Sequence, residues 1–456
     1  MSIFKAYDIR GLYPGELNEK TAFAIGLAVS ELFRPEVVAV GHDARASSEP
    51  ITAALIDALL RSNARVIDIG LVSTPMLYHY AGSLSLPLGL MVTASHNGAQ
   101  YNGFKLCRNG ARPVTAEQIA AVGEWVQRFS GNGSPRAPRN LGRAAERVDP
   151  FPEYERYVRG FARFRPGVKI AVDTANAICG MVIPRVFSAL PVDIVPLFFE
   201  LDGRFPNHEP DPLKQENTRA LQQAVIEHRC LFGAALDGDG DRVIFIDERG
   251  RYVPADIATL LIALDVIDRE APPKKVVIDT RMSKAVVEVL GKLGVEVIRG
   301  RVGHSYVKAK IHETGAVFGG ELSGHYYFRE SFFAENSDVA IIAMLNIFSQ
   351  LGHPLSALVD EYSMYFHSGE INFLVDDKER MLDRIVGSYR DAKVSHIDGV
   401  TVEYPSWWFN VRPSNTENVL RLNLEADTRG ELDARRKEVV ELIAGLGGSV
   451  ITTSSH

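Results

Sequence analysis

Short runs of apolar, often β-branched residues recur along the chain, and each run ends in a polar turn. Three of them, at residues 37–45 (VVAVGHDAR), 168–176 (VKIAVDTAN) and 275–283 (KVVIDTRMS), place an aspartate near the end. Continuous apolar runs of this length are typical of strands buried on both faces of a sheet. The pattern therefore predicts three strands in equivalent positions.

A second and a third apolar run follow each of these strands, with a helix-like segment between successive runs. The second runs are ARVIDIG, VDIVPLF and VEVIRG, and the third end in GLMVTASHNG, LFGAALDGDGDR and AVFGGELSGHYYF. Alternating strands and helical segments predict α/β units. We therefore expect three repeated α/β units, with ligand-binding groups at the carboxyl ends of the third strands.

The last hundred residues follow a different pattern. Residues 400–426 (VTVEYPSWWFNVRPSNTENVLRLNLEA) alternate apolar and polar side chains, as half-buried antiparallel strands do. Residues 428–448 (TRGELDARRKEVVELIAGLGG) predict an amphipathic helix that ends at Gly447 or Gly448. A smaller α+β domain therefore closes the chain.

The length of the chain and a stretch rich in Gly, Pro and Ser indicate how it divides into domains. A chain of 456 residues is too long for one core and suggests three or four domains. The stretch SGNGSPRAPRNLG at residues 130–142 is a linker by composition. We expect domains at residues 1–142, 143–250, 251–363 and 364–456, with a hinge near residues 361–370.

Composition narrows the classes of function. Hydrophobic residues make up 46% and charged residues 23%, as in an ordinary soluble protein, and the net charge of −7 gives no footprint for nucleic acid. No Lys/Arg run suggests a membrane patch, and the apolar run LLIAL is too short to span a bilayer. The N-terminus lacks a signal-peptide pattern. Three scattered cysteines, Cys107, Cys179 and Cys230, predict reduced structural thiols in a cytoplasmic protein.

The third strand of the second unit ends in DGDGDR, which places Asp237, Asp239 and Asp241 at alternate positions. Packed carboxylates repel one another, so this spacing indicates a cation, and oxygen ligands suit Mg²⁺ or Ca²⁺. An EF-hand loop is the competing interpretation, since Glu248 falls at its twelfth position. Its sixth position, however, holds Arg242 instead of glycine and the loop follows a strand, which favours Mg²⁺.

Three further loops carry candidate chemistry. Ser95 follows the third strand of the first unit, although a loop serine is most often a turn or cap residue. GGELSGH (residues 319–325) offers Glu321 and Ser323 to neighbouring sugar hydroxyls, or is a glycine-rich strand bend. RPSNTEN (residues 412–418) can cradle a phosphate, although PSN is also a common turn. Taken together, these loops predict phosphoryl transfer on a phosphorylated sugar.

Five motifs resemble, in order and spacing, those of the α-D-phosphohexomutase family, in particular its bacterial phosphomannomutase/phosphoglucomutase type. They are YDIRG, TASHNGAQYNGFK, DGDGDR, GELSGH and RPSNTEN, and they span nearly the whole chain. The resemblance implies three similar α/β/α domains with mixed sheets and a C-terminal α+β, TATA-binding-protein-like domain around a central cleft. Gly98 and Asn418 replace prolines that the family often has, which removes a source of rigidity from both loops.

The resemblance also implies the roles of individual residues. Mg²⁺ would be held by Asp237, Asp239, Asp241 and the phosphorylated Ser95. The other catalytic residues would be Arg10, Lys105, Arg242, His304 and His325. Substrate would be bound by Tyr7, Arg281, Glu321, Ser323, Arg412, Ser414, Asn415, Thr416 and Arg421.

The expected reaction is the reversible conversion of hexose 6-phosphate into hexose 1-phosphate. It would pass through a phosphoserine and a hexose 1,6-bisphosphate, which is both intermediate and activator. Leu322 in GELSGH resembles the mannose/glucose type, so we expect mannose and glucose phosphates as substrates. A phosphoglucosamine mutase, a sugar- or calcium-binding module and a simple phosphatase are the alternatives. Partners would be phosphosugars, without nucleic acid or membrane, and the protein would be a monomer.

Overall fold

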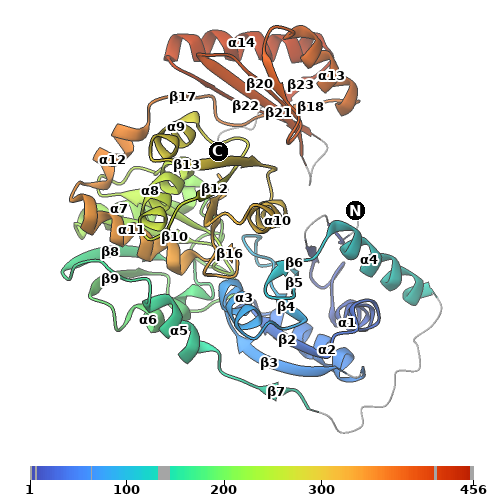
Figure 1. The fold of residues 1–456 in the computed structure, drawn as a ribbon. Helices are drawn as coiled ribbons and strands as arrows, with labels where there is room; N and C mark the ends of the chain where they lie inside the picture. The colour runs from blue at the N-terminus through green and yellow to red at the C-terminus, as the bar shows by residue number, and fades with distance from the viewer. Residues whose placement is uncertain (1–2, 6–7, 63, 132–143, 415–418, 452–456) are drawn as a thin grey trace.

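A computed structural model describes residues 3–5, 8–62, 64–131, 144–414 and 419–451. Four domains, each with its own sheet, follow one another in an arc that brings the last domain above the first (Figure 1). Tyr7, Asn415, Thr416 and Asn418 lie outside the described residues, as does most of the predicted linker.

The first domain has a seven-stranded sheet of order β1-β5-β4-β2-β3-β7, with β6 paired to β5. The sheet extends beyond residue 142, because the short strand β7 still pairs with β3. The elements are β1 (Ile9–Leu12), α1 (Glu19–Phe33), β2 (Val37–His42), α2 (Ser48–Leu60), β3 (Arg65–Leu71), α3 (Thr74–Ser83), β4 (Leu88–Val92), β5 (Tyr101–Arg108), β6 (Arg112–Pro113), α4 (Ala116–Gly131) and β7 (Glu146–Arg147).

The second and third domains have sheets of order β11-β10-β8-β9 and β13-β12-β14-β15-β16. The second contains α5 (Phe151–Arg159), β8 (Val168–Asp173), α6 (Cys179–Phe187), β9 (Val192–Leu197), η1 (Gln215–Thr218), α7 (Arg219–Glu227), β10 (Phe232–Leu236) and β11 (Val243–Asp247). The third contains α8 (Ala255–Asp268), β12 (Lys274–Asp279), α9 (Lys284–Lys292), β13 (Val295–Gly300), α10 (His304–Thr314), β14 (Phe318–Gly320), β15 (Tyr326–Phe328), β16 (Ala334–Glu335), α11 (Ser337–Leu351) and α12 (Leu355–Tyr362).

The predicted repeat of three strands is confirmed in all three units. The first strand lies between the second and the third and is parallel to both, as in β3-β2-β4, β9-β8-β10 and β13-β12-β14. The third strand then pairs antiparallel with the next strand of the chain, β5, β11 or β15. The sheets are therefore mixed. In each sheet, the loop after the third strand lies at the carboxyl end of the parallel strands.

The aspartate that ends each first strand has the same local role in the three units. Its carboxylate accepts the backbone N–H two residues later, which turns the chain out of the strand. These contacts are Asp43 with Arg45 at 3.1 Å, Asp173 with Ala175 at 2.9 Å, and Asp279 with Arg281 at 2.8 Å.

The fourth domain is an antiparallel sheet of order β19-β20-β21-β22-β18-β23, with β17 paired to β22. The predicted alternating stretch forms β20, β21 and β22. The predicted helix is confirmed but ends at Gly445, two or three residues early, and its N-cap Thr428 accepts the N–H of Glu431. The elements are β17 (Phe366–His367), β18 (Ile371–Leu374), α13 (Lys378–Ser388), β19 (Lys393–Ser395), β20 (Val400–Glu403), β21 (Trp407–Pro413), β22 (Val419–Ala426), α14 (Arg429–Gly445) and β23 (Ser449–Ile451).

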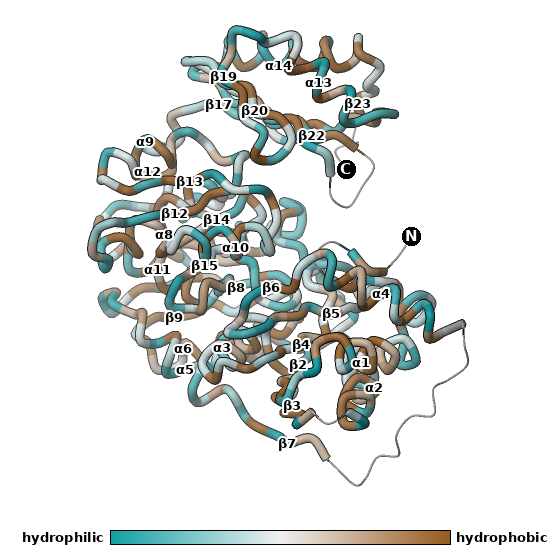
Figure 2. Tube along the Cα trace, turned by 45° about the vertical axis from the view of Figure 1, so that its right-hand side comes forward, coloured by the Kyte–Doolittle hydropathy of each residue, from teal (hydrophilic) through white to brown (hydrophobic). Residues whose placement is uncertain are grey.

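The hydrophobic core joins the first three domains and leaves the fourth separate. One buried cluster runs from Met76 of the first domain through Phe245 of the second to Met344 of the third. A different cluster, which includes Phe373 and Phe409, fills the fourth domain. Figure 2 shows hydrophobic segments along the inner strands of each domain. The three cysteines are free and buried, as expected.

Among the described residues, no single helix is long and apolar enough to cross a membrane. Taken together, α11 and α12 are long and apolar enough by length and composition alone, but the pair is bent by 90° at its break. Residues 337–348 of α11 are buried within the shared core.

Candidate active site

Ser95 lies in the loop after β4, and its backbone is held in the left-handed region with φ +51°. Non-glycine residues rarely adopt this conformation without a local constraint. The side chain is buried, and Oγ donates a hydrogen bond to Oδ2 of Asp237 at 2.9 Å. The predicted serine therefore meets the predicted metal loop, although 142 positions separate them in the sequence.

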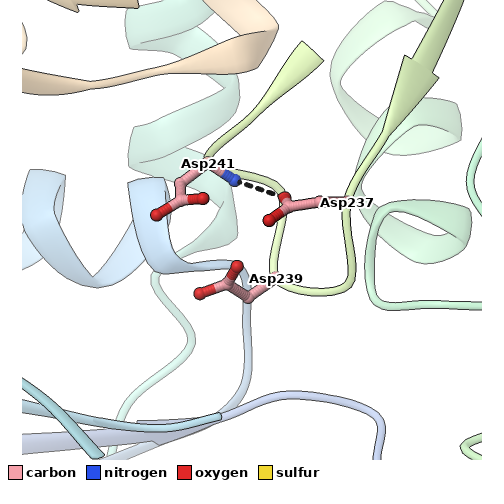
Figure 3. Close-up of side chains that lie close together, drawn as sticks. All are labelled: Asp237, Asp239 and Asp241. Atoms are coloured by element: carbon pink, nitrogen blue, oxygen red, sulfur yellow. Dashed lines mark hydrogen bonds between the residues drawn. The ribbon is translucent and has the colours of Figure 1, made fainter. Parts of the chain in front are cut away.

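Asp237, Asp239 and Asp241 lie on the tight turn between β10 and β11 and face one another (Figure 3). All three are buried, and one carboxylate oxygen of each lies within 4.8 Å of the others. Oδ1 of Asp237 accepts the backbone N–H groups of Gly240, Asp241 and Arg242 at 3.0–3.2 Å, so this carboxylate also shapes the turn. Burial, then the neighbouring carboxylates, raise the pKa of Asp237 well above its usual range.

This donor set fits a divalent cation. Oδ1 of Asp239 is buried and has no hydrogen-bond partner within the described parts of the chain. Clustered oxygen ligands match a hard ion such as Mg²⁺, whose remaining positions would be filled by water or phosphate. The residues therefore suit the metal that the sequence predicts.

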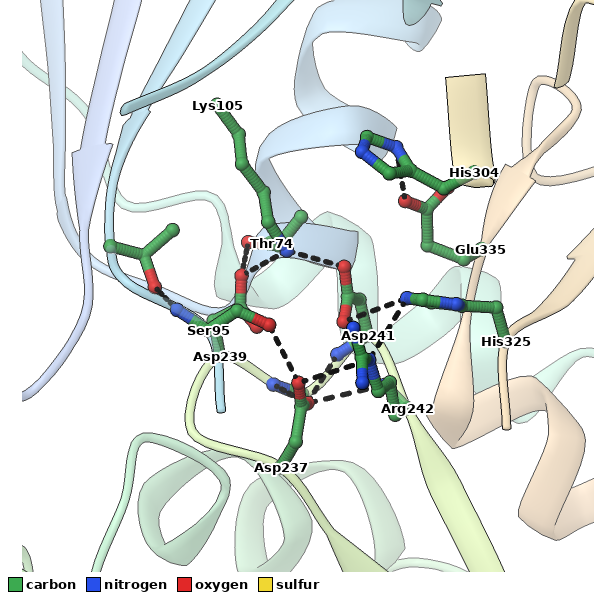
Figure 4. Close-up of polar contacts among 12 residues, drawn as sticks. Thr74, Ser95, Lys105, Asp237, Asp239, Asp241, Arg242, His304, His325 and Glu335 are labelled. Carbon is green, nitrogen blue, oxygen red and sulfur yellow. Dashed lines mark hydrogen bonds and ion pairs between the residues drawn. The ribbon is translucent and has the colours of Figure 1, made fainter. Parts of the chain in front are cut away.

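Lys105 and Thr74 contact the triad from the first domain (Figure 4). The Lys105 ammonium lies 2.7 Å from Asp239 Oδ2 and 2.5 Å from Asp241 Oδ2. Although burial opposes its charge, the aspartates raise the pKa of Lys105 above its usual value. The Thr74 hydroxyl donates to Asp239 Oδ2 at 2.5 Å, and its N–H donates to the Asp239 carbonyl at 2.9 Å. These contacts fix the first domain against the metal loop.

Arg242 and the predicted sugar loop continue the same network into the third domain. Nε of Arg242 lies 3.2 Å from Nε2 of His325, which is 3.4 Å from Oδ1 of Asp241. The other nitrogen of His325 is 2.8 Å from the Ser323 hydroxyl and 3.4 Å from the Glu321 carboxylate. Burial opposes charge on this imidazole, but Asp241 and Glu321 raise the pKa of His325 to about 9. The Arg242 guanidinium, which donates to Nε2 of this imidazole, places a positive charge beside the triad.

His304 starts α10 and lies beside His325, with ring centroids 6.2 Å apart. Its Nδ1 is 3.8 Å from Oε1 of Glu335, a buried carboxylate that also pairs with the buried Lys308 ammonium at 2.9 Å. Burial, then the charge of Lys308, lower the pKa of His304 well below its usual value. This imidazole is therefore neutral at pH 7.

Arg45 fixes the backbone of the serine loop. Its Nη2 donates to the carbonyls of Ser95 and Asn97 at 2.7 and 2.6 Å, and its Nη1 to those of Gly98 and Tyr101 at 2.7 and 3.2 Å. Its Nε donates to Asp43 at 3.0 Å. A single buried guanidinium thus supplies rigidity to a loop that lacks the family's proline at position 98. Arg10 reaches the same loop by donating to Asn97 Oδ1 at 2.6 Å.

The predicted phosphate-binding residues meet at the boundary between the third and fourth domains. Arg412, at the end of β21, and Arg421, opposite it on β22, lie 3.3 and 3.2 Å from the Glu370 carboxylate. Arg281 lies 3.9 Å from the same carboxylate. Ser414, two residues after Arg412, is also buried. We call Arg281, Arg412 and Arg421 the arginine cluster.

A chain of contacts joins the arginine cluster to the sugar loop. The Leu322 N–H donates to Oδ2 of Asp279 at 2.9 Å, and Asp279 pairs with Arg281 at 2.7 Å. Because the sugar loop also contacts Asp241 through His325, the described site residues form one continuous set. The structure therefore brings together the serine, metal, sugar and phosphate loops.

Sequence reasoning did not identify Arg45, Thr74, Glu335 or Glu370. Arg45 had a visible signal, since it follows the first-strand aspartate in the same D-x-R spacing as Arg281. Thr74 and Glu335 carry no motif and reach the site only because distant domains pack together. Glu370 falls within the predicted hinge, but nothing in the sequence indicates its contacts with the arginines.

The chain matches four family profiles, described as phosphoglucomutase/phosphomannomutase α/β/α domains I, II and III and the C-terminal domain. They match residues 1–130, 155–250, 254–365 and 370–442, in that order along the chain.

Similar curated proteins and solved structures cover almost the whole chain. A phosphomannomutase of Methanocaldococcus jannaschii is 36% identical over 99% of both chains. A phosphomannomutase/phosphoglucomutase of Pseudomonas aeruginosa is also 36% identical, over 95% of this chain and 93% of its own. The crystal structure of a phosphoglucomutase/phosphomannomutase family protein from Burkholderia thailandensis superposes with a TM-score of 0.90, at 29% identity and 98% coverage of each.

Proposed function

The chain belongs to the phosphoglucomutase/phosphomannomutase family of α-D-phosphohexomutases, and from this premise we propose how its cleft moves a phosphoryl group along a hexose. It is an isomerase, an intramolecular phosphotransferase. The contact that carries the mechanism is the 2.9 Å hydrogen bond from Ser95 Oγ to Asp237, which joins the serine loop to the carboxylate triad.

We propose that Ser95 is carried as phosphoserine and transfers its phosphoryl group to O1 of a bound hexose 6-phosphate. The P–Oγ bond breaks as the P–O1 bond forms, and overall the proton of the sugar hydroxyl moves to Ser95 Oγ. In this structure the Ser95 hydroxyl donates a hydrogen bond to Asp237. The hexose 1,6-bisphosphate then turns, and its 6-phosphate returns to Ser95 by the same step in reverse.

Asp237, Asp239, Asp241 and the seryl phosphate would hold Mg²⁺. The ion would neutralise charge on the transferring group, which with alignment supplies much of the catalysis in such reactions. Lys105, Arg242 and His325 surround the same point and would stabilise the equatorial oxygens. Arg10 would hold the serine loop through Asn97.

Glu321 and Ser323 would bind neighbouring sugar hydroxyls, while Arg281, Arg412, Ser414 and Arg421 would bind the phosphate that does not react. Mannose and glucose phosphates are the proposed substrates, supported by relatives named phosphomannomutase and phosphomannomutase/phosphoglucomutase. A phosphoglucosamine mutase is not favoured, because the relatives at 36% identity over nearly the full length are named phosphomannomutase and phosphomannomutase/phosphoglucomutase.

The central claim is tested by the mass of the intact purified protein. We expect a fraction heavier by one phosphoryl group, absent in Ser95→Ala, and lost from the wild type when unlabelled glucose 6-phosphate is added in excess. Turnover of mannose 1-phosphate and of glucosamine 6-phosphate by the same preparation tests the substrate. A protein that is never phosphorylated at Ser95 but still interconverts the sugars would refute the mechanism.

A further inference from the structure

Glu370 stands at the centre of the arginine cluster. It lies in the fourth domain, between β17 and β18. One carboxylate oxygen contacts Arg412 at 3.3 Å and Arg281 at 3.9 Å, and the other contacts Arg421 at 3.2 Å. The groups proposed to receive the substrate phosphate therefore already share a carboxylate supplied by the protein.

The charges around this point favour competition between that carboxylate and a phosphate. Asp279 already neutralises Arg281, with which it makes two hydrogen bonds. Arg412 and Arg421 each contact one oxygen of the Glu370 carboxylate, which therefore offsets part of their positive charge. Burial, and then the charge of Arg281, lower the pKa of Arg412, while Glu370 and Asp398 oppose this shift. A phosphate monoester brings a charge of roughly −2 at pH 7.

We propose that Glu370 is an internal counter-ion that limits how tightly the arginine cluster binds the non-reacting phosphate. Its carboxylate keeps the like-charged guanidiniums together before substrate arrives and then repels the incoming phosphate. The inference rests on the proposed function, because it assumes that the arginine cluster receives the substrate phosphate.

The proposed reaction explains why such a limit is useful. The phosphate end must be released in the middle of each cycle, since the bisphosphate has to turn before its second group reacts. An arginine cluster without the Glu370 carboxylate would hold a dianion longer, and release from closed sites often sets turnover. A carboxylate inside the arginine cluster weakens binding of the phosphate while leaving every hydrogen-bond donor in place.

Glu370→Gln tests the idea, because it removes the charge and keeps the size of the side chain. We expect the inhibition constant of inorganic phosphate and the KM for mannose 1-phosphate to fall about tenfold, the effect of one charge at partly buried contact distance. We expect kcat to fall as well. Glu361→Gln removes a charge from the exposed end of α12 and is the matched control, with both constants unchanged.

Two further variants keep the test decisive. Glu370→Asp retains the charge but draws it away from the guanidiniums, so both constants should fall by a smaller factor; this variant decides if Glu370→Gln does not fold. If neither variant tightens phosphate binding, Glu370 is not a counter-ion of this kind. Arg412→Ala distinguishes failure of the counter-ion proposal from failure of the proposed phosphate site. If KM and phosphate inhibition were unchanged in this variant, the phosphate site itself would be overturned.

Discussion

Arg45 makes five hydrogen bonds, four of them to carbonyls of the loop that holds Ser95. An ammonium cannot reach carbonyls spread over this range, so Arg45→Lys should leave buried acceptors unsatisfied and allow the loop to relax. We expect kcat to fall at least about tenfold while KM changes little, with about 3 kcal/mol lost from the free energy of unfolding. Steady-state kinetics and urea denaturation measure the two effects.

Arg61→Lys is the matched control, because Arg61 pairs with Asp57 on the surface of α2 at 2.7 Å. An exposed pair of this kind contributes little, so kinetics and stability should stay close to the wild type. If Arg45→Lys lowered stability but left kcat intact, Arg45 would support the fold without positioning the serine.

Oδ1 of Asp239, like Oδ1 of Asp241, is buried and has no hydrogen-bond partner in the described chain. Asp239→Asn should lower turnover with Mg²⁺ at least about a hundredfold, because it removes a ligand charge where the transferring group is neutralised. Folding should change little, since the loss of the Lys105 ion pair is offset by weaker repulsion from Asp237 and Asp241. Turnover assays and thermal melting decide; near-native turnover would make the loop structural.

At the residue scale, the sequence was informative where a candidate site residue directly follows a predicted strand. Ser95 and the three aspartates stand next to apolar runs, so both their position and their function could be predicted. Arg45 carried only the D-x-R signal and Thr74 carried none, because their partners in the serine and metal loops lie 50 or more positions away and depend on how loops and domains pack. The contact between Glu370 and the arginine cluster likewise depends on how two domains meet.

Helix α11 carries a buried acid that makes stability depend on pH. Burial raises the pKa of Asp338 to about 6 from an ordinary 3.8, although the Tyr154 hydroxyl bonds to it at 2.6 Å. The folded protein therefore binds a proton more tightly than the unfolded chain. Between pH 4 and pH 6 this group makes stability fall as pH rises, and above pH 6 the full penalty of about 3 kcal/mol is present.

Asp338→Asn removes this titration. Relative to the wild type, the variant should become more stable by about 3 kcal/mol on going from pH 4 to pH 7.5, whatever its offset at pH 4. Urea unfolding at a series of pH values measures the difference. A constant difference across the range would show that Asp338 does not titrate there.

At the scale of elements, apolar runs and their turns predicted the three repeated strand sets because each run is continuous in sequence. Strand order and direction were not visible, since whether β5 or β11 folds back antiparallel depends on the turn that carries the predicted site residues. Short strands such as β7 and β16 have two residues each and leave no periodic signal. The domain boundaries therefore stay a prediction.

At the scale of the molecule, polar contacts connect the fourth domain to the rest. Lys284 pairs with Asp427 at 2.5 Å, and the Tyr365 hydroxyl donates to Glu288 at 2.8 Å. Interfaces of this kind permit domain motion. The proposed cycle needs the arginine cluster to close on a phosphate and to reopen, so we expect the hinge at residues 361–370 to rotate.

Small-angle scattering with and without glucose 1,6-bisphosphate tests the hinge. The radius of gyration should decrease on binding in the wild type, and much less in Arg412→Ala, which cannot anchor the phosphate to the fourth domain. An unchanged radius in the wild type at saturating ligand would argue for a rigid arrangement.

The separate core of the fourth domain has an evolutionary consequence. A segment that buries its own apolar side chains and meets its neighbours through charged and hydroxyl groups can be exchanged by recombination without repacking an interior. The fourth domain, with the proposed phosphate-binding arginines, can therefore be exchanged as one unit, while the serine and metal loops stay together on the shared core of the first three domains. Chimaeras joined near residue 364 would retrace that route in the laboratory.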